Sequence, residues 1–201
     1  THLSLDDYFL ERSETPLGPN GKPDFESLNA IDVKLFDSQV SKMLKGTKVT
    51  VPTFNFIEGK KEYKRTVQLK DNDILIIEGL HALNEELLTN IPRKKKFKVY
   101  ISPLIYLNID NDNRIGMTDL RLLRRMVRDN RTRGYSPSVT LGTWMKVRSG
   151  EEKHVFPYQD NADALFNTSL AYELSVLKTY AEPLLFSIKE DDPEYQTAQR
   201  L

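Results

Sequence analysis

Cysteine is absent from this sequence of 201 residues. Its absence excludes disulfide bridges, thiolate metal sites and a cysteine nucleophile, and it makes the cytosol the simplest compartment. Long hydrophobic runs are also absent, because no apolar stretch approaches the roughly 20 residues of a transmembrane helix. The N-terminus lacks the basic and then apolar layout of a signal peptide. We therefore expect a soluble, cytoplasmic protein.

An excess of charge of either sign is missing as well. Lys and Arg together number 29, as do Asp and Glu, so no global field attracts nucleic acid or an anionic membrane. Any anion-binding site must therefore be local. Histidine is scarce, and His2, His81 and His154 share no metal-ligand spacing, so we expect structural roles for them. The length suits a single domain over residues 1–201 with a sizeable core.

What is present is organised around residues 73–80, DILIIEGL. Four consecutive aliphatic residues, three of them β-branched, predict a strand buried on both faces, as in a parallel sheet. Ligands bind at the carboxyl ends of the strands in such sheets, so the pattern places Glu78 at that edge, beside a turn at Gly79. The alternative is a solvated carboxylate where a strand reaches the surface.

The first nine residues, THLSLDDYF, alternate polar and apolar side chains and then present two aspartates. This pattern predicts the last half of a strand whose opening is missing, with Asp6 and Asp7 at its end. If this strand lies beside the one that ends at Glu78, the carboxylates converge. They would then hold Mg²⁺, or one of them would accept a proton from a hydroxyl. The alternative is an aspartate pair that caps a turn.

Hydrophobic spacing and turn residues predict the other elements. In the first part of the chain we expect a loop over residues 10–25, a helix over 31–44 and a β-hairpin over 49–69, with an edge strand at Pro52. A short helix over 84–88 and a strand over 96–104 follow. Later we expect a helix over residues 139–147, a loop over 150–163 and a last strand over 164–168. A closing helix over 172–188 should bend at Pro183. This alternation predicts an α/β sheet with a helical lid.

The most informative predicted helix spans residues 119–133, with Thr118 as its cap and Gly134 at its end. Four arginines at helical spacing form one stripe on it: Arg121, Arg124, Arg125 and Arg128. Four guanidinium groups on one face repel one another unless an anion lies opposite, and nearby only Asp119 and Asp129 would pair with them. Because arginine binds phosphate through a planar fork of donors, the stripe predicts a phosphate site. The alternative is an exposed face screened by salt.

Five segments in this order, SLDDYF, PDFESLNAID, VPTFNF, DILIIEGLHAL and DLRLLRRMVRDNRTRG, resemble the phosphoribulokinase/uridine kinase family of P-loop kinases, nearest a bacterial nucleoside-kinase-like branch. The resemblance covers nearly the whole chain up to Leu185. It implies a parallel α/β sheet with flanking helices, a β-hairpin and an arginine-rich helical lid. It also implies phosphoryl transfer from ATP, with Mg²⁺, to a small-molecule hydroxyl, the first candidate being a nucleoside 5′-hydroxyl.

The resemblance further implies roles for individual residues. Asp6 matches the general base for the hydroxyl, and with Glu78 it matches the residues that organise Mg²⁺. The lid arginines that contact the ATP phosphates and the acceptor match Arg125, Arg128 and Arg133. The substrate-binding positions match Phe25 and Glu26, of which Glu26 would bind ribose hydroxyls, and Phe54, which would stack on a base.

The sequence departs from the family pattern in two places. It contains no G-x-x-x-x-G-K-[ST] loop, whose amides and lysine cradle the phosphates of ATP. We expect that loop upstream of residue 1, on a first strand and helix, and we expect no transfer by these residues alone. In addition, the hairpin offers Phe54 and Gly59 where uridine kinases use a tyrosine and a histidine to bind the pyrimidine, which leaves specificity for uridine open.

Three hypotheses follow for the function. The first is an ATP-dependent nucleoside kinase. The second is a kinase for another alcohol, such as a sugar phosphate or pantothenate, for which the hairpin would supply cations: Lys60, Lys61, Lys64 and Arg65. The third is a non-catalytic nucleotide-binding module in a longer multidomain polypeptide. We expect small-molecule partners and neither nucleic acid nor a membrane, and the sequence leaves a homo-oligomer open.

Overall fold

The structure is a computed structural model that describes residues 1–18, 21–104, 108 and 110–201. The chain divides into two compact units, Thr1–Val99 with Ser149–Asp163 and Tyr100–Arg148 with Ala164–Leu201. The loop predicted at residues 10–25 includes two positions, 19 and 20, that lie outside the described residues. The single kinase-like domain over residues 1–201 stays a prediction.

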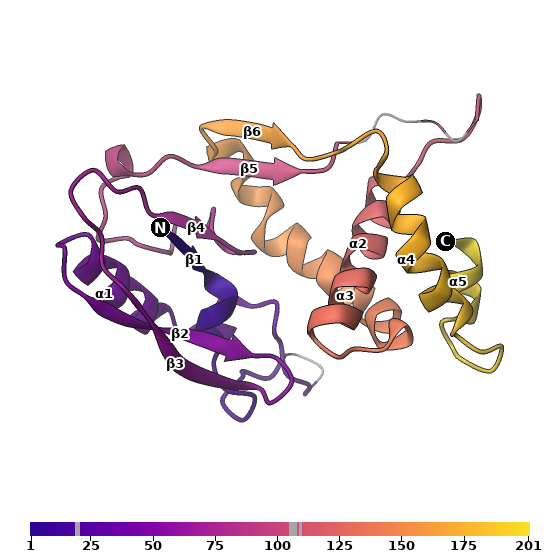
Figure 1. Cartoon of the computed structure of the whole chain (residues 1–201), viewed down its shortest axis with the longest axis horizontal. Coiled ribbons are helices and arrows are strands. Elements are labelled where there is room, and N and C mark those ends of the chain that lie inside the picture. Colours follow the sequence, from indigo (N-terminus) through magenta and orange to yellow (C-terminus); the bar gives the residue numbers. More distant parts are fainter. Residues whose placement is uncertain (19–20, 105–107, 109) are drawn as a thin grey trace. The chain divides into compact units, whose positions relative to one another are not determined.

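The first unit contains a parallel pair of short strands, β1 (His2–Ser4) and β4 (Ile76–Glu78) (Figure 1). In their register, His2 lies opposite Ile76 and Ser4 opposite Glu78. A 3-10 helix, η1 (Leu5–Tyr8), follows β1 directly and carries both aspartates. The predicted strand at the N-terminus and its parallel pairing with the strand that ends at Glu78 are therefore confirmed.

Helix α1 (Val33–Met43) packs against these strands. Asp32 caps its N-terminus, because Oδ1 accepts a hydrogen bond from the Leu35 backbone N–H (3.1 Å). The buried face of α1 joins the strand residues in one apolar core, whose fully buried members include Leu3, Leu5, Tyr8, Phe36, Val40 and Met43. Burial of these side chains is the main source of stability for this unit. A further 3-10 helix, η2 (Leu28–Ala30), precedes α1.

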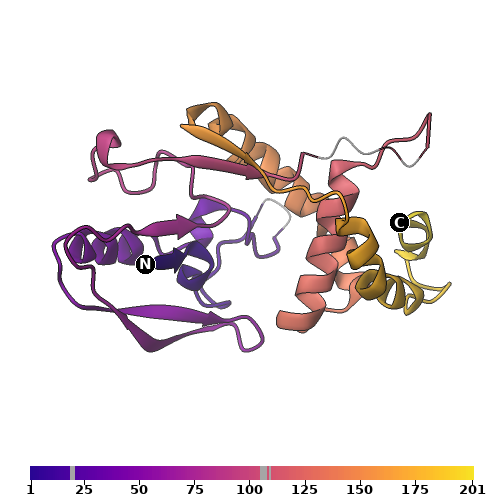
Figure 2. The same cartoon turned by 45° about the horizontal axis from the view of Figure 1, so that its top comes forward.

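The predicted β-hairpin is present as β2 (Val49–Asn55) and β3 (Lys60–Val67), which pair in antiparallel fashion (Figures 1 and 2). Its turn passes through Gly59, whose φ of +70° favours glycine. The register shifts between Val51 and Thr53, at Pro52, since proline has no N–H for the ladder. The unit also contains two 3-10 helices, η3 (Arg93–Lys95) and η4 (Phe156–Asn161).

The second unit is mainly helical. Its helices are α2 (Met117–Thr132), α3 (Pro137–His154, which extends into the first unit after Arg148), α4 (Glu173–Phe186) and α5 (Tyr195–Arg200). A two-stranded sheet of β5 (Val99–Ser102) and β6 (Ala164–Asn167) lies at its start, with both arrows pointing the same way (Figure 1). A separate apolar core contains Trp144 at 8% exposure, Leu122, Leu141 and Ile188.

The α/β class with parallel strands, flanking helices and a hairpin is confirmed, but four local predictions are wrong. The strand predicted over residues 73–80 is shorter, and Ile76 is 59% exposed because β1 is its only strand partner among the described residues. Helix α2 begins at Met117, one residue before Thr118, with Gly116 as its cap.

The other two errors concern helix limits. Residues 84–88 form turns, because Oδ1 of Asn84 accepts the Glu86 backbone N–H (2.9 Å) and so competes with a helix. Helix α3 continues through Gly150 to His154, where a loop was predicted. A Cβ at Gly150 would lie 2.7 Å from Cβ of Glu26, so the helix needs glycine there to pack closely.

Within the part of the chain that the structure describes, no helix has both the length and the apolar character needed to cross a membrane. The cytoplasmic location and the homo-oligomer stay predictions.

Candidate active site

Three carboxylates gather where β1 and β4 end, and we call Asp6, Asp7 and Glu78 the acidic strand end. Glu78 of β4 lies opposite Ser4 of β1. Asp6 comes two residues after Ser4 in the chain, and its backbone N–H donates to Oγ of Ser4 (3.3 Å). Burial raises the pKa of Asp7, and the nearby charges of Asp6 and Glu78 act in the same direction. The convergence expected from parallel pairing is therefore present.

Asp7 connects the acidic strand end to the hairpin. Its Oδ1 accepts a hydrogen bond from the Phe54 backbone N–H of β2 (3.2 Å). Burial raises the pKa of Asp7 above its usual range, while the Phe54 bond and the nearby Arg65 act in the opposite direction. Local sequence did not reveal this contact, because the partner of Asp7 lies 47 residues away and bonds through its backbone N–H.

The acidic strand end has the donor chemistry that Mg²⁺ requires. Among the described residues, no group of three or more histidine, aspartate or glutamate side chains would enclose a metal ion. Mg²⁺ in kinases, however, is bound through one or two carboxylates together with phosphate oxygens and water. The paired strand ends of Asp6 and Glu78 fit that pattern. Glu78 also lies 3.5 Å from Nε2 of His2, and both side chains are more than half exposed.

His81 lies near both the segment with Phe25 and Glu26 and the acidic strand end, because the Glu26 backbone and Asp6 both act on its ring. The His81 ring is 3% exposed and lies 5.1 Å from the ring of His154, centroid to centroid. Burial and the neighbouring His154 lower the pKa of His81 to about 4, against the opposing effects of the Glu26 backbone, Asp6 and Asp24. His81 is thus buried among these groups, and its structural role stays a prediction. Phe25 itself is 43% exposed.

Three phenylalanine rings gather beside the hairpin, and we call them the aromatic cluster: Phe9, which follows η1, and Phe54 and Phe56 from the end of β2 and the turn. Ring centroids lie 5.8 Å apart for Phe9 and Phe54 and 5.2 Å apart for Phe54 and Phe56. Phe54, predicted to stack on a base, is only 9% exposed because the other two rings cover it. Phe9 and Phe56 keep more exposed surface.

The cations of the hairpin are largely paired with groups of the protein. Nζ of Lys61 lies 2.9 Å from Oδ2 of Asp32 and is part of a half-buried pair. Lys64 pairs with Glu62 on the same strand. Nη2 of Arg65 donates to the His2 backbone oxygen (3.2 Å). These contacts reduce the positive charge that the hairpin offers to an anionic ligand.

In the second unit, the three arginines that the resemblance assigns to phosphate binding gather on one carboxylate. Asp129 is 1% exposed, and its oxygens lie 3.3 Å from Nε of Arg125, 2.6 Å from Nη2 of Arg128 and 3.8 Å from Nε of Arg133. Asp129 by itself does not neutralise three guanidinium groups. It does hold them together along the second half of α2 and its C-cap, an arrangement that suits a phosphate site.

The rest of the stripe is paired differently from the sequence expectation. Arg124 forms an ion pair with Glu173 of α4, and its Nη2 donates to the Thr168 backbone oxygen (3.1 Å). Asp119, expected to pair with the stripe, instead binds Arg200 (Nη1···Oδ2 2.8 Å). Both partners are distant in sequence, so the local pattern did not reveal them. Arg124 therefore joins α2 to α4.

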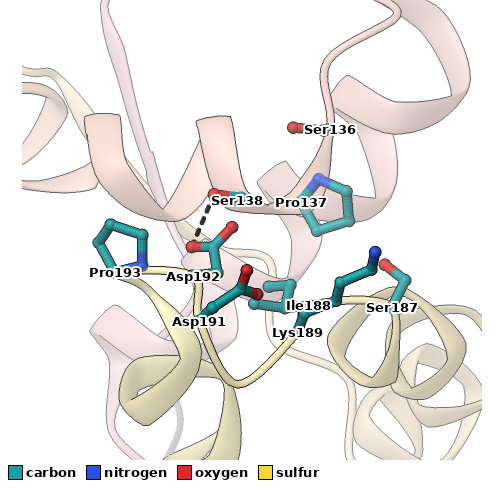
Figure 3. A pocket seen from close by; sticks show the side chains of 9 residues that line it. All are labelled: Ser136, Pro137, Ser138, Ser187, Ile188, Lys189, Asp191, Asp192 and Pro193. Atoms are coloured by element: carbon teal, nitrogen blue, oxygen red, sulfur yellow. Dashed lines mark hydrogen bonds between the residues drawn. The ribbon is translucent and has the colours of Figure 1, made fainter.

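A cavity of about 460 Å³ lies within the second unit, where α3 begins and the α4–α5 connection passes (Figure 3). Nine residues line it: Ser136, Pro137, Ser138, Ser187, Ile188, Lys189, Asp191, Asp192 and Pro193. Oδ1 of Asp192 already accepts bonds from Oγ of Ser138 (3.0 Å) and the Glu194 backbone N–H (2.8 Å). None of the residues predicted to bind substrate or metal lines this cavity.

Comparison with known proteins gives a consistent result. Residues 18–174 match the phosphoribulokinase/uridine kinase family. The uridine kinase of Lactobacillus helveticus is 27% identical over 164 residues, which cover 81% of this chain and 70% of that protein. The uridine kinase of Clostridium novyi is 28% identical, with coverage of 66% and 55%. A solved structure of a possible uridine kinase from Bacillus stearothermophilus gives a TM-score of 0.46 at 20% identity, over 83% of this chain and 71% of that one.

Proposed function

Because the chain belongs to the phosphoribulokinase/uridine kinase family, we propose that it is an ATP-dependent kinase that phosphorylates a nucleoside 5′-hydroxyl. The observation that carries this proposal is the parallel register of β1 and β4. It brings Asp6 and Glu78 to one strand end, where a proton acceptor and a magnesium ligand are both needed.

Asp6 is the proposed general base. A carboxylate at the end of β1 would accept the proton of the acceptor hydroxyl as that oxygen bonds to phosphorus. Glu78, in register with Ser4, would hold Mg²⁺ together with Asp6. When bound, the ion would neutralise negative charge on the phosphates of ATP.

Arg125, Arg128 and Arg133 are the proposed phosphate-binding residues. Their shared partner, Asp129, fixes the direction of the guanidinium groups, so less rotamer freedom is lost when phosphate binds. Guanidinium groups would also stabilise the charge that spreads over the transferred phosphoryl group.

A nucleoside is favoured over a phosphorylated acceptor by the state of the hairpin cations. Lys61 and Lys64 are paired with Asp32 and Glu62, so they would have to exchange a carboxylate for a phosphate. The aromatic cluster, in contrast, offers a base the partly exposed rings of Phe9 and Phe56, which cover Phe54. Phe25, Glu26 and Phe54 are the proposed acceptor-binding residues, with Glu26 accepting hydrogen bonds from ribose hydroxyls.

The proposal is tested first by calorimetric titration of the chain with uridine, cytidine, adenosine, guanosine, ribose 5-phosphate and pantothenate. We expect saturable binding of at least one nucleoside and no binding of the other two compounds. Because the sequence contains no G-x-x-x-x-G-K-[ST], transfer from ATP is measured in a form that carries this loop before Thr1. Selective binding of ribose 5-phosphate or pantothenate would replace the nucleoside with that class of acceptor. Nucleoside binding without transfer in the loop-bearing form would favour a non-catalytic module.

A further inference from the structure

Arg12 lies flat on the turn of the hairpin. Its Nη2 donates a hydrogen bond to the Phe56 backbone oxygen (2.6 Å), and its backbone N–H donates to the Gly59 oxygen (3.4 Å). A Cβ built on Gly59 would lie 2.5 Å from Cδ of Arg12 and 2.7 Å from Cγ. The arginine stem therefore occupies the space that any other residue at position 59 would fill.

The guanidinium group of Arg12 keeps donors available for a ligand. Arg12 is exposed, and among the described residues no carboxylate pairs with it. Arginine has five N–H donors in a fixed fork, and the bond to Phe56 uses one of them. The remaining donors are held in a defined direction by the Phe56 bond and by the contact with Gly59.

The surroundings of Arg12 belong to the proposed acceptor site. Arg12 donates to the backbone oxygen of Phe56, whose ring belongs to the aromatic cluster, and the backbone N–H of Phe54 in that cluster donates to Asp7, next to the proposed base. Apolar rings on the same segment as the carbonyl that Arg12 binds, together with an exposed fork of donors, suit a planar heterocycle that carries a carbonyl oxygen. An anionic group is less well suited here, since Asp7 and Glu58 add negative charge to the same part of the unit.

We propose that Arg12 is a specificity-determining residue of the acceptor site, where its guanidinium donates hydrogen bonds to a carbonyl oxygen of the nucleobase. The inference rests on the proposed function, because it requires a nucleoside as the acceptor. A site that presents fixed donors discriminates against ligands that leave those donors unpaired. Uridine and cytidine therefore bind more tightly than adenosine, whose base has no carbonyl oxygen.

The test is a calorimetric titration of the full chain and of Arg12→Met. Methionine keeps an apolar stem on Gly59 and removes every donor. We expect uridine to bind about ten- to hundredfold more weakly to the variant, the effect of one lost hydrogen bond to a charged donor. Lys45→Met, which removes an exposed cation after α1, is the matched control and should bind uridine as the unaltered chain does.

Two uridine analogues separate recognition from a structural role of Arg12: the ribosides of pyrimidin-2-one, which lacks O4, and of pyrimidin-4-one, which lacks O2. The unaltered chain should bind one of them more weakly than uridine, and Arg12→Met should bind that analogue and uridine equally. If Arg12 only supported the hairpin, the variant would weaken uridine and both analogues by the same factor, and recognition by Arg12 would be excluded.

Other outcomes separate this inference from the proposed function. If uridine binds Arg12→Met as tightly as it binds the unaltered chain, the role of Arg12 is overturned and the kinase proposal stands. If the variant instead loses affinity for ribose 5-phosphate alone, Arg12 binds phosphate and the nucleobase contact is wrong. If no nucleoside binds the unaltered chain, the proposed function fails and the role of Arg12 fails with it.

Discussion

At the scale of single residues, Asp6 has the sharpest expected effect. Asp6→Asn keeps the shape of the side chain and removes the proton acceptor. In the loop-bearing form we expect turnover to fall by about 10²- to 10⁴-fold, with little change in ATP affinity. A steady-state assay with the nucleoside that binds best measures both quantities.

Asp7→Asn is the control for this prediction, because asparagine keeps an oxygen that accepts the Phe54 N–H. We expect a much smaller loss of turnover in that variant. Equal losses for the two variants would show that the charge of the pair matters, and that no single carboxylate acts as the base.

His81 is expected to make stability depend on pH. Its pKa in the folded chain is about 4, lowered from 6.5 mainly by burial, so the unfolded chain binds a proton at higher pH than the folded chain does. Stability from this group is present above about pH 6.5 and is lost as the pH falls toward 4, by an amount on the order of 3 kcal/mol at most.

Urea unfolding of the chain and of His81→Phe at pH 7.5 and pH 5 measures this dependence. The variant should lose less free energy of unfolding between the two pH values than the unaltered chain. His2→Gln, which changes an exposed histidine, should behave as the unaltered chain. Identical pH dependence in His81→Phe and the unaltered chain would contradict the lowered pKa.

At the scale of elements, helix α2 carries proposed phosphate-binding arginines as well as Arg124, which pairs with Glu173 of α4. Arg128 has a side chain that is 46% exposed, so Arg128→Ala should lower the free energy of unfolding by less than about 2 kcal/mol. We expect ATP affinity to fall roughly tenfold or more in the loop-bearing form, because a charge-assisted phosphate contact is lost. Arg131→Ala, on an exposed position of the same helix, is the control. A loss of several kcal/mol in Arg128→Ala with unchanged ATP affinity would make Arg128 structural.

The hairpin turn allows a matched pair of glycine substitutions. Gly59 and Gly21 both have φ of +70°, but only Gly59 has Arg12 against it, since nothing lies within 4 Å of a Cβ at Gly21. Each change to alanine should lower the free energy of unfolding by about 1 kcal/mol, because alanine is strained at positive φ. Gly59→Ala should in addition weaken uridine binding, since the flexible Arg12 side chain must move. Equal uridine affinity in both variants would argue against a fixed Arg12.

At the scale of the whole molecule, the question is whether the two units unfold together. The chain passes between the units at residues 99–100, 148–149 and 163–164, and the single-domain prediction implies one cooperative transition. Phe36 is fully buried in the core of the first unit, and Trp144, the only tryptophan, lies in the core of the second. Phe36→Ala should lower the free energy of unfolding by about 3–5 kcal/mol. If the units unfold together, the midpoint of the Trp144 fluorescence transition should therefore fall as well.

Circular dichroism of the same sample is the companion measurement. Coincident midpoints for fluorescence and circular dichroism, both lowered in Phe36→Ala, are the expected result. An unchanged Trp144 transition beside a lowered ellipticity midpoint would show two independently folding domains.

Local sequence determined the positions of most elements and the ends of some of them. Helix α2 stops before Gly134, whose φ is +69°, and the hairpin turns at Gly59, because glycine tolerates these conformations and other residues do not. The acid that follows an aliphatic run predicted Glu78 at a strand end, since parallel strands carry ligand-binding groups there. These features depend on neighbours along the chain, so periodicity and turn chemistry reveal them.

Only the tertiary structure decided which side chains meet. Asp7 bonds to Phe54 across 47 residues, and Arg124 pairs with Glu173 across 49. Arg12 rests on Gly59 through a contact that no spacing predicts. The physical reason is that a repeating pattern reports which face of an element is apolar, whereas packing decides which other element covers that face. The sequence thus determined the acidic strand end and the arginine helix, and the fold assigned their partners.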